Sequence, residues 1–407
     1  MKKLAITAAI LLTITSGVSS QNIFKKFKDK VKEKTDAKVD QKVDNAASKT
    51  VDGADDTISG KKKKADSPAT EKSMQDTSKQ NASSDAQPSL KIYNNFDFVP
   101  GDKILFEDNF RDDQDGEFAS HWKLEEGQGV VNTQGDDRFF AFTKFYTKVS
   151  PLMKVKAYLP VDYTIEFDTW LDEGYDSNTG AMLFFKSGGE KIAQLSTNHS
   201  YFVFEKNGGK LSGDLPSAIS NEAYHNKWHH ISIAVKGKQM KVYCDQYRVL
   251  VVPDMEVKPT SITMAGDASE GKNLLIKNFK LAEGGGMNML GKKFTDTKIV
   301  THGINFDYNK ATIKPESMGT LNMIVQVMKD NPEIRFEVGG HTDSDGDDAY
   351  NLKLSQQRAD AVKKQLTVMG ISESRLTTKG YGESKPLGPN TSPEAKANNR
   401  RVEFTKL

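Results

Sequence analysis

Asp343 and Arg358 are the two side chains whose types and spacing best suit the binding of a small charged ligand. Asp343 follows an apolar run and the turn Gly-Gly-His-Thr, so its carboxylate is expected at the end of a strand. Arg358 falls on the helix predicted after that turn. A carboxylate accepts hydrogen bonds from an ammonium group, and a guanidinium binds a carboxylate through two parallel hydrogen bonds. The pair is therefore suited to holding a small zwitterion.

The predicted helix runs from about Asp348 to Met369 and positions the arginine. Its apolar stripe consists of Ser355, Ala359, Val362, Leu366 and Met369. Asn351 and Arg358 are two turns apart, so they share one face at the edge of this stripe, with Leu354 between them. Because the helix follows the Asp343 turn directly, its first turns are expected to lie beside that carboxylate.

Strand and helix patterns alternate through the last part of the chain. Pro315 is expected to open a helix that runs to about Lys329 and buries Leu321, Ile324 and Met328. The predicted strands are Ile304–Asp307, Ile334–Val338, Thr377–Tyr381 and Arg401–Phe404. This order predicts an α+β sandwich of βαβαββ type.

Five motifs in this region occur in register: INFDYNKATIKPES, the HTD turn, NLKLSQQRA, RLTTKGYGES and NRRVE. Together they resemble the OmpA-like peptidoglycan-binding domain over roughly residues 295–407. The resemblance implies that the ligand is diaminopimelate, or a similar diamino acid, in the stem peptide of peptidoglycan. It also implies that Asp343 accepts hydrogen bonds from the ligand ammonium and that Arg358 binds its carboxylate.

The same resemblance assigns further positions that line or support the pocket. They are Phe306, Asp307, Asn309, Thr342, Asn351, Leu354 and Arg400. One alternative is that Asp343 and Arg358 form a structural ion pair with each other. A second is a calcium loop beginning at Asp343, but its twelfth position is Leu354, where an EF-hand has glutamate.

Residues 91–283 contain short β-rich runs separated by Gly, Asp and Asn turns, which predicts an all-β sandwich. In Tyr163–Leu171, Ile165, Phe167 and Leu171 alternate with Glu166, Asp168 and Trp170. A β-hairpin is predicted from Trp228–Val235 and Met240–Tyr243, which are joined by a turn at Gly237. The phrase WHHISIAVKGKQMKVYCDQ is similar to the laminin-G or concanavalin-like jelly roll. That similarity implies two sheets that bind a glycan or an envelope protein.

Two other classes of protein compete for this middle region. An outer-membrane β-barrel porin needs long strands with an unbroken apolar face, whereas charges interrupt runs such as Lys144–Lys156. A jelly-roll glycosidase would use Glu166 and Asp168 with a further carboxylate two residues on, and that position is Trp170. We therefore expect no catalytic residues and no enzyme activity, and the porin stays as the alternative.

No metal or cofactor is expected either. His225, His229 and His230 are candidate ligands, but adjacent residues of a strand point to opposite faces, so these side chains should not converge. Cys244 is the only cysteine, and Met240 and Val242 share its face of the strand. We interpret it as a buried apolar residue.

The N-terminus predicts export. Residues 1–20 have the basic start, short apolar core and small residues of a signal peptide. Residues 21–90 form a Lys-rich low-complexity linker, in which Phe24, Phe27 and Val31 and the lysines around them predict a partly helical, membrane-surface segment. No cysteine follows the expected cleavage point, which excludes a lipid anchor there. A Gly-rich linker at residues 284–294 separates the two folded regions.

These features predict a cell-envelope protein on the periplasmic side of the outer membrane, attached peripherally and bound to peptidoglycan. The formal charge is +2, and removal of residues 1–20 with Lys2 and Lys3 leaves 2 − 2 = 0. A neutral chain argues against nucleic acid as a partner.

Overall fold

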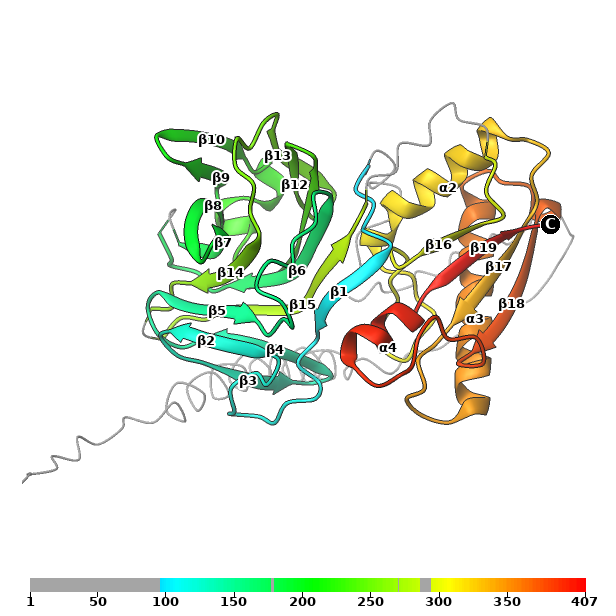
Figure 1. The fold of residues 1–407 in the computed structure, drawn as a ribbon, viewed down its shortest axis with the longest axis horizontal. Coiled ribbons are helices and arrows are strands. Elements are labelled where there is room, and N and C mark those ends of the chain that lie inside the picture. The colour runs from blue at the N-terminus through cyan, green and yellow to red at the C-terminus, as the bar shows by residue number, and fades with distance from the viewer. Residues whose placement is uncertain (1–95, 177–178, 270, 286–293) are drawn as a thin grey trace, which may run out of the picture. The chain divides into compact units, whose positions relative to one another are not determined.

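The computed structural model describes residues 96–407, apart from residues 177–178, 270 and 286–293 (Figure 1). The predicted signal peptide and the predicted linker, including Phe24, Phe27 and Val31, lie outside the described residues. Every residue that the structure describes falls within one compact unit. None of the helices in this part of the chain is both long and apolar enough to cross a membrane.

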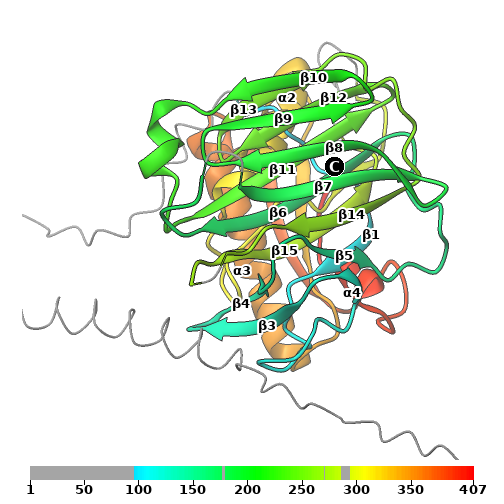
Figure 2. The ribbon, with the colours of Figure 1, turned by 90° about the vertical axis from the view of Figure 1, so that its left-hand side faces the viewer.

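Residues 103–283 fold into two antiparallel sheets that face each other (Figures 1 and 2). The first sheet contains β1 (Lys103–Asp108), β3 (Gly129–Gln134), β4 (Asp137–Phe142), β6 (Tyr163–Leu171), β11 (Trp228–Lys236), β12 (Gln239–Cys244), β13 (Tyr247–Val252) and β15 (Leu274–Glu283). The second contains β2 (Trp122–Glu126), β5 (Thr147–Pro151), β7 (Gly180–Ser187), β8 (Glu190–Asn198), β9 (Tyr201–Lys206), β10 (Gly209–Asp214) and β14 (Ser261–Gly266). The strands thus form a sandwich of two sheets.

Strand β6 shows how the alternating sequence builds this sandwich. Ile165, Phe167 and Leu171 enter the apolar core between the sheets. On the opposite face, Glu166 and Asp168 are also buried, at 3% and 9% exposed. At these two positions the outer face of the first sheet is therefore polar but shielded from solvent.

The predicted hairpin is confirmed. Strands β11 and β12 pair from Ile231 opposite Cys244 to Lys236 opposite Gln239, which leaves a two-residue turn. Gly237 opens this turn with a φ of +59°. A two-residue hairpin turn favours glycine at such a position because it requires a left-handed backbone.

The C-terminal part combines helices with a four-stranded sheet in the order β16-β19-β17-β18. Its elements are β16 (Lys298–Thr301), α2 (Met318–Asp330), β17 (Phe336–His341), α3 (Asp348–Val368), β18 (Leu376–Gly382), α4 (Pro393–Asn399) and β19 (Val402–Lys406). Helices α2 and α3 share one apolar core with β17 and β19, and Leu321, Ile324 and Met328 are fully buried in it. The predicted α+β class is confirmed.

The predicted strand Ile304–Asp307 is wrong, because this segment makes only a single β-bridge, from Phe306 to Ile313. The backbone groups that a strand would need are used locally. The Asn305 N–H donates to Ser317 Oγ at 2.9 Å, and the chain turns back immediately. Strand β16 takes the place of the expected first strand.

Helix α4 was not predicted. Pro393 occupies its first turn, and Ser392 Oγ accepts a hydrogen bond from the Ala395 N–H at 3.2 Å. A serine cap followed by proline is a helix-start signal. The signal was present, but a helix of this length has too few turns to show a periodic apolar stripe.

Candidate functional site

The end of strand β17 places Asp343 against helix α3. A side chain at Gly340 would lie 2.2 Å from the Ser355 carbonyl oxygen of that helix, so only glycine allows this approach. The Thr342 N–H then donates to the Gly382 carbonyl at 3.0 Å, which fixes the chain just before Asp343. The Asp343 side chain is only 11% exposed.

The first turn of helix α3 fixes the loop that carries the carboxylate. Asp347 caps the helix by accepting hydrogen bonds from the Ala349 and Tyr350 N–H groups. The Asn351 amide donates to the carbonyls of Asp343, at 3.3 Å, and Asp345, at 3.0 Å. Asn351 therefore supports the pocket by holding its loop, and Asp347 serves as a helix cap.

Arg358 lies two turns farther along α3 and is half-buried. Its Nε donates to the Lys310 carbonyl at 3.1 Å, and its guanidinium lies 5.0 Å from the centre of the Phe306 ring. Burial lowers the pKa of Arg358. Among the residues that the structure describes, no carboxylate lies within ion-pair distance of it, so the guanidinium keeps its capacity to bind an acid.

Asp343 forms its ion pair with Arg400 and not with Arg358. Arg400 also pairs with Glu107 of strand β1. Burial by itself would lower the pKa of Arg400, but the carboxylates of Glu107 and Asp343 outweigh it and raise that pKa. The alternative in which Asp343 and Arg358 neutralise each other is therefore wrong.

One cavity of about 690 Å³ brings most of the predicted site residues together. Its lining includes Asn309, Thr342, Asp343, Asn351, Leu354, Arg358 and Arg400. Phe306 does not line this cavity, but its ring contacts the Arg358 guanidinium. Asp307 lines a neighbouring cavity. A carboxylate and an unpaired guanidinium on one cavity can together bind a molecule that carries both an ammonium and a carboxylate.

The sequence of this region matches known proteins. Residues 305–400 match the OmpA family. They form an OmpA family domain. The outer membrane porin F of Pseudomonas fluorescens is 48% identical to the chain over 100 residues, which are 25% of this chain and 31% of that protein. The peptidoglycan-associated lipoprotein of Pseudomonas putida is 36% identical over 101 residues, 25% of this chain and 60% of that protein.

Among solved structures, the cell wall anchor of the type VI secretion system from Pseudomonas aeruginosa shows 28% identity and a TM-score of 0.25. The match covers 27% of this chain and 80% of that one. The two relatives named above are likewise matched over only part of their length, 31% and 60%. Each of these matches covers about a quarter of the chain.

The sandwich acids that suggested a glycosidase are held in a buried ionic cluster. His230 Nδ1 lies 2.7 Å from Asp168 Oδ1, and Nε2 lies 3.4 Å from Glu166 Oε2. Burial by itself would raise the pKa of both carboxyls. Lys280 and His230 outweigh it at Glu166, and His230 with Lys314 and Lys277 outweighs it at Asp168, so each pKa is held below its usual value. A glycosidase needs one carboxylic acid that stays protonated, and neither group meets that requirement.

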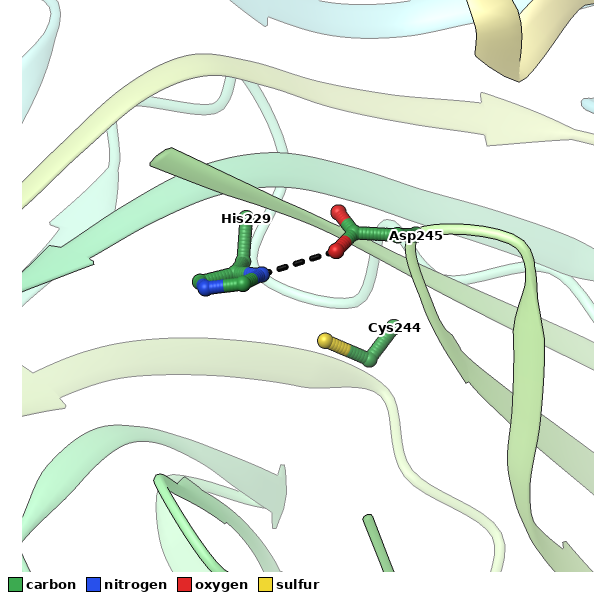
Figure 3. A group of neighbouring side chains, drawn as sticks. All are labelled: His229, Cys244 and Asp245. Carbon is green, nitrogen blue, oxygen red and sulfur yellow. Dashed lines mark hydrogen bonds and ion pairs between the residues drawn. The ribbon is translucent and has the colours of Figure 1, made fainter. Parts of the chain in front are cut away.

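His229, Cys244 and Asp245 are the one group of metal-ligating type found among the described residues, with ligand atoms within 4.8 Å of one another (Figure 3). His229 Nδ1 lies 2.8 Å from Asp245 Oδ2, and its Nε2 lies 3.0 Å from the Tyr224 carbonyl. Both ring nitrogens are therefore already hydrogen-bonded. Burial raises the pKa of the Cys244 thiol, which disfavours the thiolate that metals bind.

The three histidines considered as ligands do not converge. His229 and His230 bond to different partners on opposite faces of β11, and His225 Nδ1 lies 2.9 Å from the Asp172 carbonyl. Cys244 is buried as predicted. The three histidine side chains bond to neighbouring strands and loops.

Sequence reasoning missed the cavity residues that come from the sandwich. Glu107, Asn109 and Arg111 line the same cavity as Asp343 and Arg358. Glu107 lies in an alternating apolar and acidic strand, where it has no feature that distinguishes it from a solvated carboxylate. No motif in the sequence could have found it.

Proposed function

We propose that the OmpA family domain binds peptidoglycan without covalent attachment, through the diamino acid of the stem peptide, and so anchors the protein to the cell wall. The observation that carries this proposal is the Arg358 guanidinium, which has no ion pair within the described residues and lines the same cavity as Asp343. Arg358 binds the ligand carboxylate, and Asp343 accepts from the ligand ammonium while it remains in contact with Arg400. The name of the Pseudomonas putida relative supports this class of ligand.

The proposal also covers enzyme activity, location in the cell and the role of the sandwich. The protein is not an enzyme, and it acts on the periplasmic side of the outer membrane, held by the wall and by peripheral contacts. The sandwich is proposed to be a jelly roll that recognises a glycan or an envelope protein. Diaminopimelate is the diamino acid that the resemblance implies.

Co-sedimentation of the purified protein with cell-wall sacculi tests the wall-binding proposal. Arg358→Ala removes the guanidinium without opening the core, because Arg358 lies at the edge of the α3 stripe. Loss of a hydrogen-bonded charged contact costs about 1.5–3 kcal/mol, which corresponds to roughly 10-fold or more in affinity. The matched control is Lys353→Ala, which removes one exposed positive charge from the same helix.

We expect Arg358→Ala to lose sacculus binding while Lys353→Ala and the unfolding midpoints stay at wild-type values. Soluble stem peptide with a free diamino acid should compete for the site, and glycan strands stripped of stem peptide should not. Equal binding by Arg358→Ala and wild type, or equal competition by stem-free glycan, would show that the assignment is wrong.

A further inference from the structure

The far wall of the cavity that holds Asp343 and Arg358 comes from the sandwich. The sandwich residues on it are Glu107, Asp108, Asn109, Arg111, Asp112 and His121. They belong to the end of strand β1 and to the loop that follows it. The cavity is therefore lined by both the sandwich and the OmpA family domain, which the sequence predicts to be separate domains.

Direct hydrogen bonds fix strand β1 against the OmpA family domain. The Asn398 amide, at the end of helix α4, accepts from the Ile104 N–H and donates to the Ile104 carbonyl, both at 2.9 Å. Arg400, two residues later, pairs with Glu107. This double contact orients the loop after β1 toward the cavity.

Arg111 lies on that loop and resembles Arg358 in its surroundings. Its guanidinium lies 3.7 Å from the centre of the Tyr308 ring, and its Nη2 donates to the Asp136 carbonyl at 2.9 Å. No ion pair to Arg111 is found within the described residues. Asp112, its neighbour in sequence, is exposed and does not pair with it either.

A single loop of the OmpA family domain contacts both arginines. Tyr308 stacks against Arg111, and the Lys310 carbonyl accepts from Arg358 Nε. The cavity therefore presents two guanidinium groups that have no acidic partner among the described residues. A guanidinium held by an aromatic ring and one carbonyl still has donors left for a carboxylate.

We propose that Arg111 is a second carboxylate-binding residue of the wall-binding pocket. This inference rests on the proposed function and specifies its ligand further. The ligand is a stem peptide that carries one ammonium and at least two carboxylates, one held by Arg358 and another by Arg111. The sandwich then takes part in recognition of the wall directly.

Isothermal titration calorimetry of the full chain with two synthetic stem peptides tests this inference. In one peptide all carboxylates are free, and in the other every carboxylate except that of the diamino acid is amidated. For the wild type, amidation should weaken binding about 10-fold. Arg111→Gln should weaken binding of the free peptide by a similar factor and leave binding of the amidated peptide unchanged.

The control is Lys123→Gln, which removes an exposed positive charge from strand β2 and should bind both peptides as the wild type does. Arg111→Lys keeps the charge but loses the planar fork, so it should fall between wild type and Arg111→Gln. Equal loss for both peptides, or no loss for either, overturns the role of Arg111. If Arg358→Ala also binds the free peptide normally, the proposed function itself fails.

Discussion

Replacing His230 by leucine should destabilise the folded protein strongly, because it leaves two buried carboxylates without their shared partner. The side chains of His230, Asp168 and Glu166 are only 16%, 13% and 3% exposed. Removing one partner from a buried ionic contact costs about 3–5 kcal/mol. At about 2–4 °C per kcal/mol for a domain of this size, the melting temperature should fall by roughly 6–20 °C.

The effect should depend on pH. Burial by itself would lower the pKa of His230, but Asp168 and Glu166 raise it well above the usual value. The imidazolium therefore contributes stability that is lost only as pH rises through this raised pKa. The paired acids contribute stability that is lost only as pH falls through their lowered pKa values. In His230→Leu the unpaired acids take up protons more readily, so its deficit should be largest near pH 7 and should shrink in acid.

Urea unfolding followed by tryptophan fluorescence measures this loss. His225→Leu is the matched control, because His225 bonds to a backbone carbonyl and its removal leaves no charged group without a partner. The triple variant His230→Leu, Glu166→Gln, Asp168→Asn should recover most of the loss, because the buried charges are then gone. A loss below about 1 kcal/mol at pH 7, or no recovery in the triple variant, would refute the reasoning.

Two further predictions concern the OmpA family domain. Gly340→Ala should destabilise it by about 1–3 kcal/mol, because the added Cβ meets the Ser355 carbonyl oxygen. Gly388→Ala is the control and should leave the stability unchanged, because a Cβ at that position meets no neighbouring atom. Equal urea unfolding midpoints for the two variants would contradict this prediction. Burial, together with the Arg401 guanidinium, lowers the pKa of His341 to about 4. As the pH is lowered, His341 therefore takes up a proton in the unfolded chain before it does so in the folded protein, and the free energy of unfolding should fall between about pH 6.5 and pH 4. His341→Phe should flatten that fall in unfolding curves recorded across this range.

Local patterns in the sequence determined most of the secondary structure. The apolar stripes of α2 and α3, the alternation in β6 and the hairpin at Gly237 each follow from the period of a regular backbone. The α+β class of the last domain and the place of Asp343 beside α3 followed from element order. The failures, at residues 304–307 and in α4, are short segments whose backbone bonds are decided by Ser317 and Ser392.

The charge pairing of the site was decided by tertiary structure alone. Arg400 reaches both Asp343 and Glu107, residues 57 and 293 positions away. Arg358 is left without an acidic partner in the part of the chain that the structure describes. A sequence period shows which face of an element is apolar or charged, but not which distant element covers that face. For this reason the motif identified the carboxylate and the guanidinium, whereas only the packing of β1 against α4 determined which charges are neutralised and which remain available to a ligand.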